Sequence, residues 1–282
     1  MPIYVVTLQC ADAPGIVLAA SSGIVALGGN IVENDQFTDP MTNEFCMRTR
    51  FETKADDLNV VRASLLESLV QFAPSLGVRL EESRRRCVVM VSQYDHCLAD
   101  LLYRREQGDL PLDIVAVVSN HPTCRALCER YGVAFHEVSA GARAKQVAEA
   151  TLRELVRSEG ADFVVLARYM QILSADLCDE LRGRVVNIHH SFLPGFKGAR
   201  PYHQAYERGV KLIGATAHFV TAELDEGPII EQDTVRVSHS LRASDLVALG
   251  RDIERSVLSR AVRLLAEDRV SLVGQRTVVF AP

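Results

Sequence analysis

The chain has 282 residues, 48% of them hydrophobic, and carries 31 Lys and Arg against 36 Asp and Glu. This length allows one large or two ordinary domains with a buried core. The mildly negative charge argues against binding to nucleic acid, because a nucleic-acid binder usually presents a basic face.

The first eighty residues predict a small domain with a four-stranded sheet. β-Branched and apolar runs alternate with amphipathic segments, and Gly28-Gly29 ends the first helix. The order strand, helix, strand, strand, helix, strand is that of a ferredoxin-like βαββαβ domain. The expected strands are residues 3–8, 30–38, 44–53 and 78–81, and the expected helices are residues 16–27 and 58–72.

This predicted domain, with Asp12 and Gly15 in its first turn and Asn30 after Gly29, resembles the ACT domain. The resemblance implies a regulatory module that often binds amino acids where two copies pair. An amino-acid effector would then contact the chain near Asp12, Gly15 and Asn30, and the protein would be a homo-oligomer. A module that only builds the oligomer interface is an equally good interpretation, because this fold hosts many functions.

Residues 13–32 carry no charge, which raises the question of a membrane span. They contain Pro14, four glycines and Asn30, so their helical part is too short to cross a bilayer. The chain also starts without a signal-peptide pattern. Its seven cysteines lie mostly among apolar neighbours, which is typical of a reducing compartment. We therefore expect a cytoplasmic protein that does not bind membranes.

Arg84-Arg85-Arg86 interrupts the apolar pattern and marks the expected boundary between domains 1–83 and 84–282. Beyond it strands and helices alternate, which predicts a mostly parallel, Rossmann-like α/β sheet covered on both faces. The expected strands are residues 87–92, 114–119, 134–138, 163–167, 184–188 and 212–220, and the expected helices are residues 98–105, 124–131, 142–159, 175–181 and 243–267.

The first strand-to-helix junction of this domain, residues 91–97, contains no glycine. Backbone amides therefore cannot close around a phosphate as they do in glycine-rich loops, and a dinucleotide cofactor is not expected. The bulky residues Gln93, Tyr94 and His96 stand in that place instead.

Polar chemistry is concentrated between residues 184 and 231. Asn187 and His189 are two residues apart at a strand end, so their side chains should point to the same face of the strand. Ile188 and His190 should point to the opposite face. Asp225 lies in a second polar loop, after the strand at 212–220. The carboxyl ends of strands are where open α/β sheets bind ligands.

An amide, an imidazole and a carboxylate can together add water or an amine to a carbonyl group. Asn187 would donate a hydrogen bond to the developing oxyanion, His189 would move protons, and Asp225 would hold the imidazolium or orient the nucleophile. The alternative is a hydrogen-bonded core histidine and a solvated turn residue. The joint placement of the three residues makes the two interpretations about equal.

The segments NIHHSFLPGFKGARPYHQAY and GATAHFVTAELDEGPII resemble the formyltransferase superfamily that uses 10-formyltetrahydrofolate. The shared pattern is Asn-x-His near a strand end, followed by His218 seven residues before Asp225. Over its whole length the chain resembles the formyltetrahydrofolate deformylases of that superfamily.

The resemblance implies hydrolysis of 10-formyltetrahydrofolate to tetrahydrofolate and formate, supplying formate for purine synthesis, with no metal or cofactor. It implies substrate binding by the loop Met170, Gln171, Ile172 and Leu173, and by Glu223 and Leu224. Lys197 and Arg200 are candidates for attracting the anionic substrate. Related glycinamide ribonucleotide formyltransferases carry a glycine-rich phosphate loop at the position that corresponds to residues 91–97 of this chain. The absence of that loop here implies that water, and not a phosphorylated amine, accepts the formyl group.

Three other functions remain open at this stage. The chain could transfer formyl to a small amine, or sense amino acids and bind folate without turnover. It could also hydrolyse its substrate with a metal bound by His189, His218 and Asp225. Without the resemblance, Met170, Ile172 and Leu173 would be interpreted as core residues.

Overall fold

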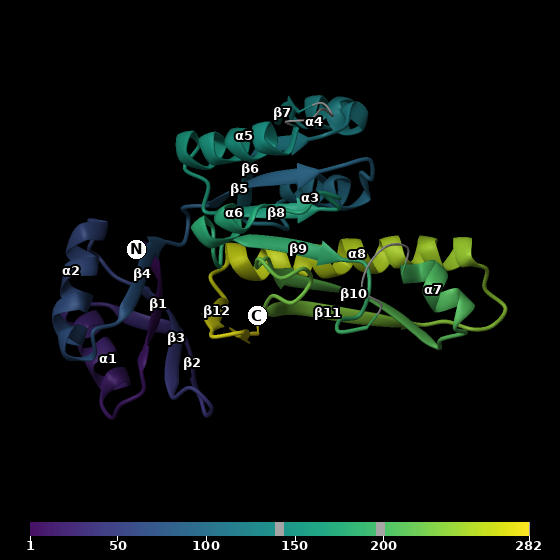
Figure 1. Cartoon of the computed structure of the whole chain (residues 1–282). Coiled ribbons are helices and arrows are strands. Elements are labelled where there is room, and N and C mark those ends of the chain that lie inside the picture. Colours follow the sequence, from purple (N-terminus) through teal and green to yellow (C-terminus); the bar gives the residue numbers. More distant parts are fainter. Residues whose placement is uncertain (139–143, 196–200, 282) are drawn as a thin grey trace. The chain divides into compact units, whose positions relative to one another are not determined.

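The computed structural model describes residues 1–138, 144–195 and 201–281. The chain divides into two compact units, Met1–Arg84 together with Glu267–Pro282, and Arg85–Ala266. The sequence predicted that residues 84–282 form the second domain. The structure instead puts the segment from Glu267 onward in the first unit, because it forms a hairpin that packs there (Figure 1).

The first unit has the predicted ferredoxin-like fold. Its antiparallel sheet has the strand order β2-β3-β1-β4 and is covered by two helices whose apolar residues face it. Asp57 caps α2 by accepting a hydrogen bond from the Asn59 amide. The elements are β1 (Ile3–Ala11), α1 (Ile16–Ala26), β2 (Asn30–Asp39), β3 (Glu44–Glu52), α2 (Leu58–Leu69), a 3₁₀ turn (Val70–Phe72) and β4 (Ser75–Leu80).

The C-terminal hairpin, β12 (Val270–Val273) and β13 (Arg276–Val279), completes this unit. Val273 and Phe280 pack on Cys46 of β3. The Arg48 guanidinium donates to the Glu267 carbonyl at 2.9 Å, and Arg269 forms an ion pair with Glu33 at 2.9 Å.

The second unit contains a seven-stranded sheet of order β11-β10-β9-β8-β5-β6-β7. Strands β5 to β9 run parallel to one another, and β10 runs antiparallel to both of its neighbours, β9 and β11. The order reverses between β5 and β8, because β6 lies on one side of β5 and β8 on the other. The strands are β5 (Arg85–Val91), β6 (Leu112–Ser119), β7 (Ala134–Glu137), β8 (Phe163–Ala167), β9 (Val185–His189), β10 (Leu212–Phe219) and β11 (Ile229–Arg236).

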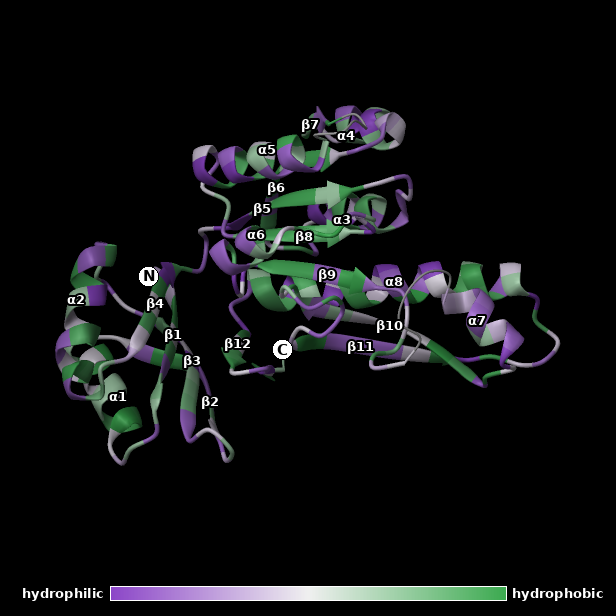
Figure 2. Ribbon diagram, in the orientation of Figure 1, coloured by the Kyte–Doolittle hydropathy of each residue, from purple (hydrophilic) through white to green (hydrophobic). Residues whose placement is uncertain are grey.

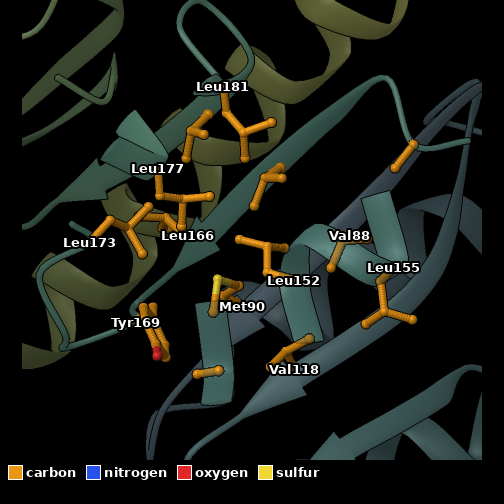
Figure 3. Close-up of a cluster of buried hydrophobic side chains, with 14 of the residues drawn as sticks. Val88, Met90, Val118, Leu152, Leu155, Leu166, Tyr169, Leu173, Leu177 and Leu181 are labelled. Atoms are coloured by element: carbon orange, nitrogen blue, oxygen red, sulfur yellow. The ribbon is translucent and has the colours of Figure 1, made fainter. Parts of the chain in front are cut away.

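Helices cover both faces of this sheet, as the alternating pattern predicts. Val88 and Met90 of β5 face a cluster that includes Leu152 and Leu177 (Figure 3). The intervening Val89 is equally buried, as expected for a strand covered on both faces. Hydrophobic residues accordingly fill the central strands (Figure 2). The helices are α3 (His96–Gln107), a 3₁₀ turn (Pro122–Cys124), α4 (Arg125–Arg130), α5 (Ala144–Ser158), α6 (Ala175–Glu180), α7 (Pro201–Glu207) and α8 (Ala243–Ala266).

Two elements of this unit were not expected from the sequence. Strand β11 extends the sheet beyond β10, and α7 begins at Pro201, between two of the strands expected from the sequence. Arg85 and Arg86, expected in a linker, start β5 and pair with Asp162 and Glu159. Within the described residues no helix is long and apolar enough to cross a membrane.

Candidate active site

A cleft of about 300 Å³ opens where β8, β9 and β10 end in the second unit, beside the reversal of strand order. Its walls contain the predicted catalytic residues Asn187, His189 and Asp225. They also contain both predicted substrate-binding loops, that is Met170, Gln171, Ile172 and Leu173, and Glu223 and Leu224. The structure therefore brings all nine residues to one place.

Asn187 and His189 lie on one face of β9, as their alternation predicts, and His218 of β10 is paired directly with Asn187. The pairing of β10 with β11 shifts register opposite Ala217 and His218, and the extra residue, Ile230, lies on β11, so His218 keeps its regular pairing with Asn187. The Asn187 amide nitrogen lies 3.3 Å from His218 Nε2.

The hydrogen bonds of His218 fix its tautomer and the orientation of Asn187. His218 Nδ1 lies 2.9 Å from the Phe219 carbonyl oxygen, to which it donates. Burial lowers the pKa of His218, so the ring is neutral and its Nε2 is an acceptor. The Asn187 NH₂ group therefore faces His218, and its second N–H remains for a ligand. The sequence analysis noted His218 only as part of a motif or as a metal ligand.

Asp225 reaches the site from a tight turn. Its φ of 58° is left-handed, a conformation that aspartate tolerates better than most residues. The turn depends on Gly227, since a Cβ there would lie 1.7 Å from the Phe219 carbonyl oxygen. Asp225 Oδ1 lies 3.2 Å from His189 Nδ1 and 3.8 Å from His218 Nε2.

Asp225 is held as a carboxylate. Burial alone would raise its pKa, but the hydrogen bond from His189 and the nearby imidazoles outweigh burial and lower the pKa. In the tautomer of His189 whose Nδ1–H donates to Asp225, the other ring nitrogen carries a lone pair. That atom, Nε2, is buried and has no hydrogen-bond partner among the described residues.

His190 also lines the cleft, which corrects the expectation that only one of the two histidines would do so. Strand β9 ends at His189, so strand alternation does not apply to the next residue. The His190 ring packs edge-on against His189 and against Tyr202. Burial, with the Arg168 charge, lowers the pKa of His190 to about 3.

The loop after β8 is fixed to the neighbouring strand. Ser92, which follows β5, accepts a hydrogen bond from the Met170 amide at 3.0 Å and donates to Asn120 at 2.7 Å. Leu173 is buried in the hydrophobic cluster, but Met170 and Ile172 are 53% and 59% exposed. The core interpretation therefore holds only for Leu173. Exposed apolar side chains at the mouth of a cleft suit a flat ring system.

The second loop contributes mainly exposed groups. Glu223 and Leu224 line the cleft beside Asp225, and both are exposed. Thr221 donates to the Glu223 carbonyl at 3.1 Å, which stabilises the turn. Lys197 and Arg200, which the sequence analysis named for attraction of an anionic substrate, lie outside the described residues.

A polar network under the cleft was not expected. Buried Glu254 of α8 accepts hydrogen bonds from His96 and Tyr202, each at 2.8 Å, and forms an ion pair with Arg168 at 3.4 Å. Arg168 lines the cleft and, like Asp225, has a left-handed φ. These residues come from separate elements, so no spacing in the sequence connects them.

His96, Cys97 and Glu254 form the one group in the described ranges whose ligand atoms are close enough for a metal ion. The chemistry of the group does not fit one. Burial holds the pKa of the Cys97 thiol well above its usual range, so the thiolate ligand is not formed. Both Glu254 oxygens already accept hydrogen bonds from other side chains.

The first unit separates the residues proposed for an effector. Asp12 and Gly15 follow the end of β1, and Gly15 has a φ of 100° at the start of α1. Asn30 pairs with Glu52, which pairs with Ile3 at the beginning of β1. The length of β1, about 25 Å at the usual rise per residue, thus separates Asn30 from Asp12. One copy of the chain does not bring the three together.

The family model described as Formyl transferase matches residues 85–262. A formyltetrahydrofolate deformylase from Corynebacterium sp. is 49% identical over 98% of this chain and 98% of its own length. One from Bacillus subtilis is 44% identical over 97% of this chain and 92% of its own length.

Solved structures give the same picture. The crystal structure of formyltetrahydrofolate deformylase from Burkholderia mallei is 44% identical, covers both chains completely and superposes with a TM-score of 0.95. A glycinamide ribonucleotide transformylase from Symbiobacterium toebii is 32% identical over 70% of this chain and 94% of its own, with a TM-score of 0.65.

Proposed function

Because the chain belongs to the formyl transferase family, and within it to the formyltetrahydrofolate deformylases, we infer that it hydrolyses 10-formyltetrahydrofolate to tetrahydrofolate and formate. The single observation that carries this function is the cleft in which Asn187, His189 and Asp225 meet. The formate it releases is available for purine synthesis.

We propose that His189 is the base. Its Nδ1–H donates to the Asp225 carboxylate, so its buried Nε2 accepts a proton from the water that attacks the formyl carbon. Asp225 stabilises the imidazolium that forms. His189 then returns the proton to N10 as the carbon–nitrogen bond breaks. The second water proton leaves with formic acid, which ionises to formate.

Asn187 stabilises the oxyanion in this proposal. One amide N–H is occupied by the Nε2 of neutral His218, which holds the side chain in place. The other N–H is left to donate to the formyl oxygen as it becomes negative. One oxyanion donor of this kind typically contributes about 10² to 10³ in turnover.

The pterin ring is proposed to lie against the loop after β8. The exposed Met170 and Ile172 side chains offer apolar contact, and the backbone of residues 171–173 would offer hydrogen bonds, since the Met170 amide already donates to Ser92. Gln171, Glu223 and Leu224 line the same cleft and would contact the substrate from its open side. No step of this chemistry uses a metal or a cofactor.

The test is formate release from 10-formyltetrahydrofolate by chelator-treated protein with no amine present. Rapid release that is lost in Asp225→Asn supports the proposal. Release that depends on an added amine would make the protein a transferase. Loss of activity on chelation, restored by a metal, would refute the cofactor-free mechanism.

We propose that the first unit regulates and assembles the enzyme. Strand β2 is a sheet edge on which Val32 and Phe37 are exposed, so a second copy can pair there. An amino-acid effector contacting Asp12, Gly15 and Asn30 requires two copies, because one copy keeps Asn30 apart. Calorimetry with single amino acids, beside sedimentation of the protein, tests both parts.

A cytoplasmic location is also proposed. All seven cysteines are free and buried, as expected for a protein of a reducing compartment. Fractionation of cells expressing the tagged protein tests this location, and recovery outside the cytoplasm would refute it.

A further inference from the structure

Arg168 is a buried cation whose hydrogen-bonding capacity is largely unused. Its side chain is 9% exposed, and its Nε and Nη1 atoms have no hydrogen-bond partner within the described part of the chain. A guanidinium has five N–H donors, and burying them without acceptors is costly. Such an unpartnered group in the wall of a cleft indicates a ligand that supplies the acceptors.

The nearby carboxylate of Glu254 makes no hydrogen bond with Nε or Nη1 of this guanidinium. Glu254 lies 3.4 Å from Arg168 Nε, which gives charge attraction but no hydrogen bond. Its Oε1 accepts from Tyr202 and its Oε2 from His96, so the carboxylate is oriented by those two side chains and does not form the two-bonded fork that carboxylates make with arginine. Glu254 therefore holds Arg168 in place and leaves its donors available.

The Tyr94 ring also holds Arg168 in place. The guanidinium carbon lies 5.3 Å from the centre of the Tyr94 ring, and Arg251 lies over the same ring at 5.8 Å. The left-handed backbone at Arg168 turns the chain directly after β8, at the strand end where the cleft opens.

Arg168 also shares the cleft with the reacting groups. His190, His189 and Arg168 all line it, and the His190 ring packs on His189. Hydrolysis converts a neutral formyl group into a planar carboxylate at His189. The group best suited to a planar carboxylate is an arginine with free donors.

We propose that Arg168 forms a carboxylate-binding subsite in the cleft and receives the formate that hydrolysis releases. This inference rests on the proposed function for the source of the formate. The site itself is a property of the folate-free protein, so its binding is measurable without turnover.

The experiment uses sodium ¹³C-formate and three variants of the full chain. Formate signal broadening is titrated on folate-free protein, with sodium chloride at equal ionic strength as reference. Inhibition of hydrolysis by formate is measured beside it. Arg168→Gln removes the fork, Arg168→Lys keeps only the charge, and Arg251→Gln is the matched control over the same Tyr94 ring.

We expect Arg168→Gln to weaken formate binding about tenfold or more, and Arg168→Lys about threefold or more, because a lysine cannot form the fork. Arg251→Gln should bind formate as the wild type does. Unchanged formate binding in Arg168→Lys, or in a folded Arg168→Gln, overturns the proposal. A raised folate KM with unchanged formate binding also overturns it, since Arg168 would then serve the substrate.

The lysine variant keeps a cation beside Glu254, so it answers the question if the glutamine variant does not fold. Failure of the enzyme to release formate from 10-formyltetrahydrofolate would refute the proposed function, whereas the broadening of the formate signal would still report on the subsite. The two failures are therefore distinguishable.

Discussion

Replacing Asp225 by Asn should abolish most turnover and leave the fold intact. The carboxylate oxygen lies 3.2 Å from His189 Nδ1 in a largely buried site. At an effective dielectric constant of about 20, its attraction to the imidazolium formed during the reaction is about 5 kcal/mol. Asparagine loses this charge but accepts the left-handed φ of 58° and keeps a hydrogen-bond acceptor.

A loss of about 5 kcal/mol from the transition state corresponds to a decrease in kcat of roughly 10³ to 10⁴. The free energy of unfolding should fall by only about 1 kcal/mol, the difference between a charge-assisted and a neutral hydrogen bond. Single-turnover formate release and urea unfolding measure the two quantities.

The matched control is Asp268→Asn in the first unit. Asp268 has a φ of 56° and is paired with Arg79, so the same chemical change occurs in the same backbone conformation. Its kcat should stay near that of the wild type. Turnover above about a tenth of wild type in Asp225→Asn would refute the role of the carboxylate in stabilising the imidazolium.

Three other perturbations have definite expected results. His218→Phe removes the acceptor that holds the Asn187 amide and should lower kcat about 10- to 100-fold with little change in KM, by steady-state kinetics. Gly227→Ala places a Cβ on the Phe219 carbonyl and should lower the melting temperature and the turnover together. The pKa of His190, lowered to about 3, means that this ring is neutral when folded and binds a proton only when unfolded between pH 6.5 and 3. Its contribution to stability is therefore complete above about pH 6.5 and is lost as the pH falls, by roughly 2 kcal/mol at pH 5, and His190→Gln should flatten urea unfolding against pH.

Much of the fold follows from local patterns. Alternation and helical periodicity predict the bounds of β1 to β10 within a few residues, because the apolar face of each buried strand or amphipathic helix is visible in its own sequence. Strand β11, Ile-Ile-Glu-Gln-Asp-Thr-Val-Arg, escapes such reasoning because it is a half-exposed edge rich in polar residues. Helix α7 escapes it because Pro201 suggests a loop, although proline is favourable in a first helical turn.

The site shows a similar division. Asn187 and His189 are predictable because strand alternation places them on one face. The position of His218 beside Asn187 depends on the pairing of β9 with β10, and that of Asp225 on a left-handed turn, so neither follows from a local pattern. The contact of Arg168 with Glu254 joins β8 to α8, and no local pattern reports a pair so distant in sequence.

The C-terminal hairpin has a consequence for synthesis and for protein engineering. Arg48 and Glu33 of the first unit find partners in Glu267 and Arg269, which the ribosome adds only after the whole second unit. During synthesis the first unit therefore stays incomplete while some 180 further residues are added, at the usual 5 to 20 residues per second. A fragment cut at residue 84 would expose Cys46 and leave Arg48 buried near only part of its partners, so an independent version of this module needs residues 267–281 joined to it.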